Sequence, residues 1–95
     1  MAAYVIADVN VKNPDAYQEY RKQVLATIEK YGGRFLVRGG EHEVLEGSWR
    51  PHRLVILEFP DMAAAKRWHR SPEYAPLIKL RQSASDGTLV AVAGA

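Results

Sequence analysis

The chain has 95 residues, of which 47% are hydrophobic and 25% charged, and these are ordinary values for a globular protein with one core. It contains no cysteine, so disulfide frameworks and cysteine-ligated metals are excluded. Thirteen basic and 11 acidic residues are well mixed and leave a net charge of +2, which indicates a solvated surface rather than a nucleic-acid interface. We expect one domain over residues 1–95.

The N-terminal segment predicts neither a signal peptide nor a membrane anchor. No basic residue precedes its first apolar residues, and Asp8 interrupts them before a signal-like apolar region forms. No apolar run approaches the roughly 20 residues that a membrane-spanning helix needs. We therefore expect a cytoplasmic protein without a membrane partner.

The first third of the chain predicts a strand followed by a helix. Residues 3–11 are rich in β-branched side chains, as in a strand. Asn13 is the expected N-cap of the helix, with Pro14 at its first position and Asp15 near the positive end of its dipole. Gly32-Gly33 ends the helix. Apolar side chains recur at helical spacing on one face: Tyr17, Tyr20, Val24, Ile28 and Tyr31, with Leu25 beside them.

The middle of the chain predicts strands. Residues 34–38 form a short strand, and Gly39-Gly40-Glu41 turns the chain. Residues 42–48 are then either its hairpin partner or a short extension of the same strand. After a loop at residues 49–51, residues 52–59 form the clearest strand of the protein.

The last third predicts a broken helix and a final strand. Pro60-Asp61 ends the preceding strand and caps a helix over residues 62–70. Ser71-Pro72-Glu73 is a fresh capping sequence, so the helix breaks and restarts through Leu80. Asp86-Gly87 predicts a turn before a strand at residues 88–92.

The order βαββαβ predicts an α+β, ferredoxin-like fold in which both helices cover one face of an antiparallel sheet. The strand at residues 52–59 is apolar on both sides, since Val55 and Leu57 alternate with Leu54 and Ile56. A second copy of the chain is the simplest cover for the other face, so we expect a homodimer. A chain of this length has little core to spare, so a pocket is expected on the open face or between subunits.

Several familiar motifs are absent. His42-Glu43 resembles the start of a zinc-protease motif, but the second histidine is missing and the segment is not predicted to be helical. No phosphate-binding glycine loop and no nucleophile elbow occurs. The strand at residues 52–59 lacks the aromatic and basic pattern of RNA-recognition motifs. We expect no metal, no cofactor and no nucleic-acid partner.

Charged residues interrupt the predicted strands, and two interpretations stay open. Charges in a partly buried sheet are costly unless paired. They either pair with one another or lie exposed at strand ends, or they line a pocket in which arginine holds an anion. Trp68 and Tyr74 fit core packing or an aromatic wall over a ligand, and Arg81 either reaches the sheet or caps a helix. The interrupting residues are Asp8, Arg38, Glu46, Arg53 and Glu58.

Four segments in this order resemble the DUF1330 family of the dimeric α+β barrel superfamily: residues 31–40, 45–49 and 57–61, and Trp68 with residues 71–74. The resemblance implies two sheets packed face to face across a dimer axis. The family has no known function. His69 stands where a typical member often has tyrosine. The residues that match the family pattern are Gly33, Arg38, Glu46, Gly47, Arg53, Glu58, Trp68, Ser71, Tyr74 and Arg81.

Three functions are left open. Related barrels resemble cofactor-independent monooxygenases, lactone isomerases and haem-handling proteins, which implies proton transfer or oxygenation of a small anionic or aromatic acid. Arg38 or Arg53 would hold the anion, and Glu46 or His69 would move the proton. The chain is otherwise a non-catalytic dimer that binds a small metabolite, or a structural dimer without a ligand. The expected ligand-binding residues are Arg38, Arg53, Trp68, Tyr74 and Arg81.

Overall fold

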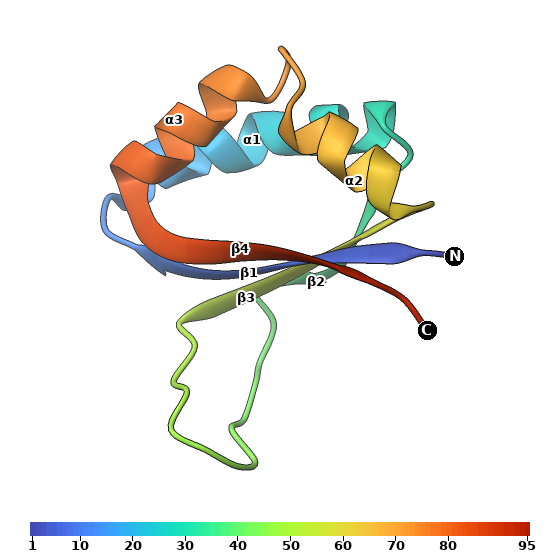
Figure 1. The fold of residues 1–95 in the computed structure, drawn as a ribbon. Coiled ribbons are helices and arrows are strands. Elements are labelled where there is room, and N and C mark those ends of the chain that lie inside the picture. Colours follow the sequence, from blue (N-terminus) through green and yellow to red (C-terminus); the bar gives the residue numbers. More distant parts are fainter.

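Two layers, one of sheet and one of helices, make up the structure (Figure 1), a computed structural model that describes residues 1–95. The sheet is antiparallel with the strand order β2-β3-β1-β4, and all three helices lie on one face of it. None of the helices has the length and hydropathy of a membrane-spanning segment. The elements are β1 (Ala3–Val11), α1 (Pro14–Lys30), β2 (Arg34–Arg38), β3 (Arg53–Phe59), α2 (Met62–His69), α3 (Ala75–Ala84) and β4 (Ser85–Ala93). The predicted α+β, ferredoxin-like class is confirmed.

Helix α1 begins and ends where its sequence predicts. The Asn13 side chain accepts a hydrogen bond from the backbone N of Ala16, at 3.2 Å. The helix stops before Gly32, whose φ of 82° is open to glycine at little cost. Leu25 differs from the expected apolar stripe, because it is 38% exposed on the outer side of the helix.

The predicted break between α2 and α3 is confirmed. Asp61 caps α2 with its side chain. Ser71 then turns the chain: its Oγ donates to the carbonyl of Trp68 and accepts from the backbone N of Tyr74. Helix α3 continues past the expected end at Leu80 as far as Ala84. The turn between the helices fixes Trp68 and Tyr74 beneath the helix layer.

The two faces of the sheet differ in cover. Alternate residues of β1, from Ala3 to Val9, are buried under the helices. On the other face Ile6 pairs with Ile56 of β3 and Val90 of β4, and no element of this chain covers them. Val90 is 56% exposed. The open face is therefore an apolar surface at its centre.

A bulge in β2 decides which of its side chains face the helices. Phe35 pairs with Leu57 and Arg38 with Val55, both on the covered face. Residues three apart in a regular strand lie on opposite faces. The register shift between Phe35 and Val37 removes that difference, so Arg38 turns toward the helices.

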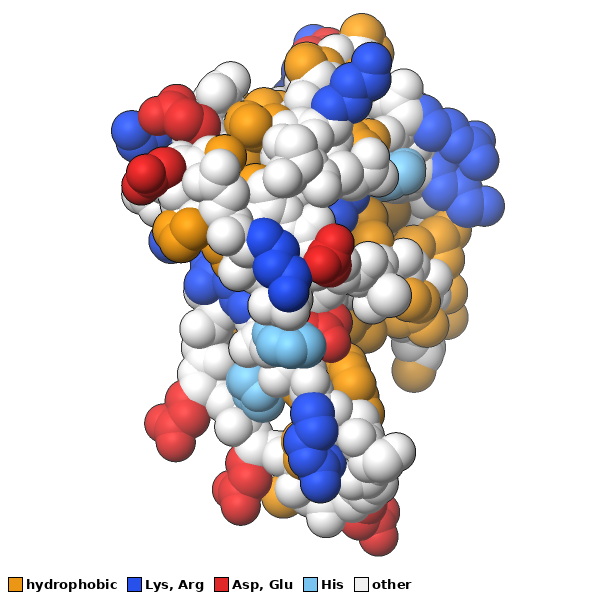
Figure 2. Space-filling view, turned by 90° about the vertical axis from the view of Figure 1, so that its left-hand side faces the viewer, with side chains coloured by type: hydrophobic (Ala, Val, Ile, Leu, Met, Phe, Trp, Pro, Cys, Tyr) orange, Lys and Arg blue, Asp and Glu red, His pale blue; other side chains and the backbone are white.

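The expected strand at residues 42–48 is wrong. Residues 39–52 form one long loop that projects from the sheet on the side away from the helices (Figures 1 and 2). Strand β2 pairs directly with β3, and the backbone N of Gly39 donates to the carbonyl of Leu54 at 2.8 Å. The intervening residues are left with no strand to pair with, so their weak alternation forms no ladder.

Asp8 fastens this loop to the open face. Its carboxylate accepts hydrogen bonds from the backbone N of His52, at 2.9 Å, and from Trp49 Nε1, at 3.0 Å. The bond from His52 lowers the pKa of Asp8, burial opposes that change, and the bond from Trp49 lowers the pKa further. Asp8 is thus a structural anchor and not a free strand charge.

The expected turn at Asp86-Gly87 is also wrong, because both residues lie inside β4. Helix α3 passes directly into the strand, and Ser85 Oγ donates to the carbonyl of Arg81 at that junction. A Cβ at Gly87 would collide with the backbone of Asp8 and Val9. The glycine allows β4 to approach β1 closely. Because glycine is also common in turns, this position resembles a turn in the sequence.

Candidate functional site

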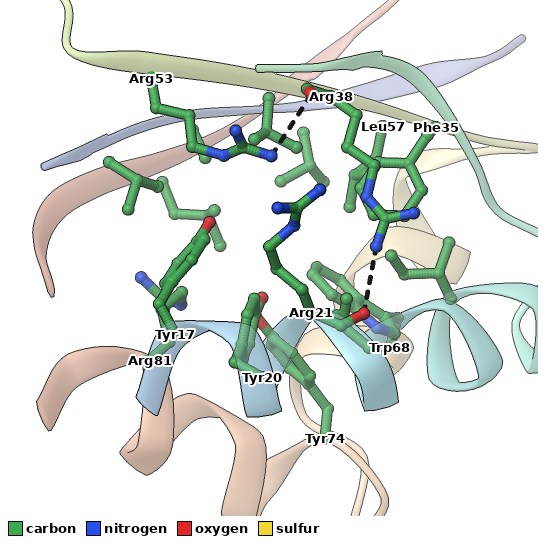
Figure 3. A pocket seen from close by; sticks show the side chains of 17 residues that line it. Tyr17, Tyr20, Arg21, Phe35, Arg38, Arg53, Leu57, Trp68, Tyr74 and Arg81 are labelled. Carbon is green, nitrogen blue, oxygen red and sulfur yellow. Dashed lines mark hydrogen bonds between the residues drawn. The ribbon is translucent and has the colours of Figure 1, made fainter. Parts of the chain in front are cut away.

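A cavity lies between α1 and the covered face of the sheet (Figure 3). Seventeen residues line it, and 13 of them are hydrophobic. The other four are all arginines: Arg21, Arg38, Arg53 and Arg81. The cavity encloses about 30 Å³, room for one or two waters. It lies within one chain, under the helices, and not on the open face of the sheet.

Two of the arginines come from the strands at the neck of the long loop. Arg53, at the start of β3, donates from Nη2 to the carbonyl of Arg38, at 3.3 Å. Arg38, at the end of β2, donates from Nη2 to the carbonyl of Arg21, at 3.1 Å, and lies 4.3 Å over the Phe35 ring. A Cβ at Gly39 would occupy the space of the Arg53 guanidinium, so this glycine gives the side chain its room. Backbone carbonyls are the only hydrogen-bond partners of these two guanidinium groups.

The other two arginines come from helices. Arg21 projects from α1 toward the sheet, among Arg38 and Arg53 (Figure 3). Arg81, near the end of α3, is 8% exposed and lies apart from these three, beyond Tyr17 in the view of Figure 3. The four side chains therefore enter the cavity from four elements, two strands and two helices, and from opposite walls.

No carboxylate balances these charges. None of the four guanidinium groups has an acidic oxygen within 4 Å. The ion pairs of the chain all lie elsewhere. Nε of Arg21, Arg53 and Arg81 is buried without any hydrogen-bond partner. Burying an ion costs several kcal/mol unless it is compensated. The cavity is consequently a strongly cationic, largely apolar chamber.

Aromatic side chains form the wall nearest the helices. Trp68 stacks on Tyr74 with ring centroids 4.2 Å apart, and its Nε1 donates to Thr27 Oγ at 3.0 Å. The hydroxyls of Tyr20 and Tyr74 share a hydrogen bond of 2.7 Å. Burial raises the pKa of Tyr20, and Tyr74 raises it further. Tyr20 thus stays a neutral hydrogen-bonding group across the physiological range.

The structure brings all five expected ligand-binding residues to this one cavity. They are Arg38, Arg53, Trp68, Tyr74 and Arg81.

The two expected proton-transfer residues are not among its lining. Glu46 is exposed on the long loop, beyond the opposite face of the sheet. His69 lies at the surface of α2, where burial and then the charges of Arg81 and Arg70 lower its pKa. Glu58 pairs with Arg34 on the open face, at 2.8 Å. The strand charges therefore fall into two groups, of which only the arginines belong to the cavity.

Sequence reasoning missed Arg21, although a signal was present. Arg21 is four residues after Tyr17 and three before Val24, so it lies on the same helical face as the apolar stripe. A charge inside such a stripe is the helical equivalent of Arg53 inside an apolar strand. No cluster of three or more histidine, aspartate or glutamate side chains in the structure could hold a metal ion.

The sequence matches a known family along nearly its whole length. The matching family is described as a domain of unknown function, DUF1330, and the match covers residues 2–95. The chain belongs to DUF1330. A comparison with functionally curated proteins gives no match.

Solved structures resemble this DUF1330 protein in fold. A protein of unknown function from Rhodopseudomonas palustris is 23% identical, with a TM-score of 0.79 over 99% of this chain and 82% of that one. SnoaB, a cofactor-independent oxygenase from Streptomyces nogalater, is 16% identical, with a TM-score of 0.64 over 99% of this chain and 92% of that one. A dimeric ferredoxin-like protein of unknown function from Jannaschia sp. CCS1 is 12% identical, with a TM-score of 0.66 over 99% and 100%.

Proposed function

We propose that this protein binds a small organic anion in the cavity between α1 and the sheet. The observation that carries the proposal is the set of four arginines with no carboxylate among the 17 lining residues. Arginine binds carboxylate through two parallel hydrogen bonds, and such bonds are about twice as strong as neutral ones. An anionic ligand would compensate guanidinium groups that the protein itself leaves without a carboxylate, and among these groups Arg81 is buried.

A purely structural role for the arginines is less consistent with their surroundings. If Arg38 and Arg53 were structural, Glu46 and Glu58 would be their natural partners. Glu58 pairs with Arg34 instead, and Glu46 lies on the loop. Apolar side chains of similar size would fill the same space without the cost of desolvation. Retaining charge there favours a ligand over packing.

The rest of the lining favours an anion with an apolar or aromatic body. Tyr17, Trp68 and Tyr74 offer ring faces and edges, and aliphatic residues of the sheet close the other side. The free volume is about 30 Å³, so such a ligand would enter by displacing the flexible arginine side chains that occupy the middle of the cavity. This is a site that forms around its ligand.

We further propose that the protein acts as a homodimer through the open face of the sheet. Ile6, Ile56 and Val90 form an uncovered apolar row across three strands. An exposed apolar surface on a small protein is typical of an interface, and a symmetric copy supplies a self-complementary cover. The dimeric ferredoxin-like protein from Jannaschia sp. CCS1 has the same fold.

Oxygenase-type chemistry on the bound anion is a second candidate. The likeness to SnoaB favours it, and arginines around a buried ligand would stabilise negative charge that develops during reaction. The cavity contains neither a carboxylate nor a histidine to move a proton. Catalysis would therefore need proton transfer by a tyrosine or by the ligand itself, which is why binding is our first proposal. Dioxygen uptake with a bound phenolic acid distinguishes the two.

The test of binding replaces one cavity arginine and one surface arginine. Benzoate and its neutral analogue benzamide are titrated calorimetrically into the wild type, Arg53→Met and Arg34→Met. We expect benzoate to bind and benzamide not to bind. Arg53→Met should weaken benzoate binding about tenfold or more, since a hydrogen bond to a charged group contributes about 1.5–3 kcal/mol. Arg34→Met should bind as the wild type does.

Arg53→Met is chosen because methionine keeps the apolar stem while removing the charge. A thermal unfolding curve for each variant serves as the control for folding. Unchanged benzoate binding together with lost stability in Arg53→Met would give Arg53 a structural role instead.

A further inference from the structure

The four cavity arginines are divided between two ends of the chamber. The Arg53 guanidinium donates to the carbonyl of Arg38, and the Arg38 guanidinium donates to the carbonyl of Arg21, so these three residues form one group. Arg81 has no hydrogen bond to any of them and enters from α3, on the helix side (Figure 3). Tyr17 lies between Arg81 and the group of three in that view.

No ion pair within the chain accounts for the charge of Arg81. Arg81 is only 8% exposed, and its Nε has no hydrogen-bond partner. A basic residue near a helix C-terminus often bonds to the last carbonyl groups. Here the carbonyl of Arg81 accepts from Ser85 Oγ, at 2.6 Å, and no hydrogen bond from the Arg81 guanidinium to a carbonyl occurs. The helix end is satisfied without the guanidinium.

The surroundings of Arg81 suit a second acidic group. Arg81 lines the cavity together with Tyr20 and Tyr74, and it lines a separate surface hollow with His69. In the hydrogen-bonded pair of Tyr20 and Tyr74, one phenol donates to the other, and the acceptor keeps its own proton free for a ligand. A cation and a neutral donor together recognise a carboxylate or a phenolate.

One acidic group cannot compensate both ends. A carboxylate has two oxygens, and a guanidinium binds both of them through two parallel hydrogen bonds. Bound to the group of Arg21, Arg38 and Arg53, it would leave Arg81 buried and unbalanced. Apolar side chains such as Val55 and Leu89 line the space around these ends.

We propose that the ligand is a two-ended anion, with an acidic group at each end of an apolar, planar body. Arg21, Arg38 and Arg53 hold one end, and Arg81 with the phenol pair holds the other. This inference rests on the proposed anion-binding function and names its ligand class: dicarboxylates, or aromatic acids with an ionised hydroxyl opposite the carboxylate.

The experiment compares acids that differ only in the second charge. Terephthalate and 4-methylbenzoate share one skeleton, as do fumarate and crotonate at a shorter length. Each is titrated calorimetrically into the wild type, Arg81→Met and Arg70→Met, the last being an exposed arginine of the same charge outside the cavity. Inorganic phosphate serves as a dianion whose charges share one centre.

At one of the two lengths we expect the diacid to bind about tenfold or more tightly than its monoacid, as one additional charge-assisted contact implies. Arg81→Met should bring the two affinities within about twofold of each other by lowering that of the diacid alone. Arg70→Met should keep the wild-type preference. Unfolding curves, with Arg81→Gln as a second variant, check that the fold is intact.

Other results would overturn the inference in distinguishable ways. Monoacids that bind as tightly as diacids at both lengths would make the ligand one-ended and leave anion binding standing. If phosphate bound more tightly than either diacid, and with the same affinity in Arg81→Met as in the wild type, the ligand would be a single-centred anion. If no acid binds at all, the proposed function itself fails.

Discussion

Charges on the two faces of the sheet are treated in opposite ways. On the open face Arg34 donates to Glu58, and Asp8 accepts from His52 and Trp49, so each charge has a partner within the chain. On the covered face Arg53 donates only to a carbonyl oxygen, and its buried Nε has no partner. The better-shielded face, where an unbalanced charge costs more, is the one that leaves it unbalanced.

The difference separates structural charge from functional charge. A pair such as Arg34 and Glu58 supports the strand register, and its charges are compensated without a ligand. Unpartnered cations in a cavity lower stability, and proteins retain such groups mainly where function needs them. The same contrast tells which substitutions should remove stability, which should add it, and which should be nearly silent.

The largest effect should come from the neighbours Leu57 and Ile56, which lie on opposite faces of β3. Leu57→Ala removes a side chain that is 4% exposed under the helices, and should lower the free energy of unfolding by about 2–5 kcal/mol. In a monomer Ile56→Ala should cost less, since Ile56 is only partly buried. Denaturant unfolding of both variants measures the difference.

Protein concentration makes this comparison a test of the homodimer. If a second copy covers the open face, the cost of Ile56→Ala should grow with protein concentration while that of Leu57→Ala keeps its own value, because association adds to apparent stability by mass action. Sedimentation should then give wild-type dimers that Ile56→Ala weakens. A wild type that is monomeric at every micromolar concentration would refute the dimer.

A smaller effect, of opposite sign, should follow from Arg81→Met. Methionine replaces a buried, unbalanced cation with an apolar chain of similar reach, so the free energy of unfolding without ligand should rise by about 1 kcal/mol or more. Arg34→Met removes a pair in which the Arg34 side chain is 69% exposed, and should lower stability by about 0.5 kcal/mol. Denaturant midpoints of the two variants give the comparison. A loss of stability in Arg81→Met would mean that its charge supports the fold.

The sequence predicted what is local and missed what depends on pairing. The caps at Asn13 and Asp61, and the break at Ser71, follow from side chains that bond to their own neighbourhood, and they are confirmed. The strand at residues 42–48 was wrong because a strand needs a partner, and β2 and β3 already pair with each other. Gly87 was misassigned because close strand packing and turning use the same residue type.

The site could be predicted in composition but not in arrangement. Arg53 is two residues from Val55 and four from Leu57, so the sequence predicts that all three lie on one side of β3. Arg38 lies on the covered side only because of the bulge in β2, and no sequence pattern predicted that bulge. The position of the cavity under the helices depends on the space that Gly39 and the aromatic wall leave, which is a property of packing.

The smallest effect should be a pH-dependent loosening of the long loop, read at the two tryptophans. The pKa of Asp8 is lowered in the folded protein from its ordinary value of 3.8, so its bonds contribute stability that is complete above that value. This contribution should be lost as pH falls through the lowered folded pKa. The Trp49 indole N–H donates to Asp8 on the open face, whereas that of Trp68 donates to Thr27 in the core.

In a titration followed by NMR, the Trp49 indole resonance should therefore move in acid while that of Trp68 stays in place until global unfolding. Asp8→Asn should remove the acid transition of Trp49, since an amide does not titrate. Comparing the variant with the wild type at each pH separates Asp8 from the other carboxyl groups. If both indoles moved together, the loop would unfold with the core, and the open face would not be the independently anchored region that its hydrogen bonds indicate.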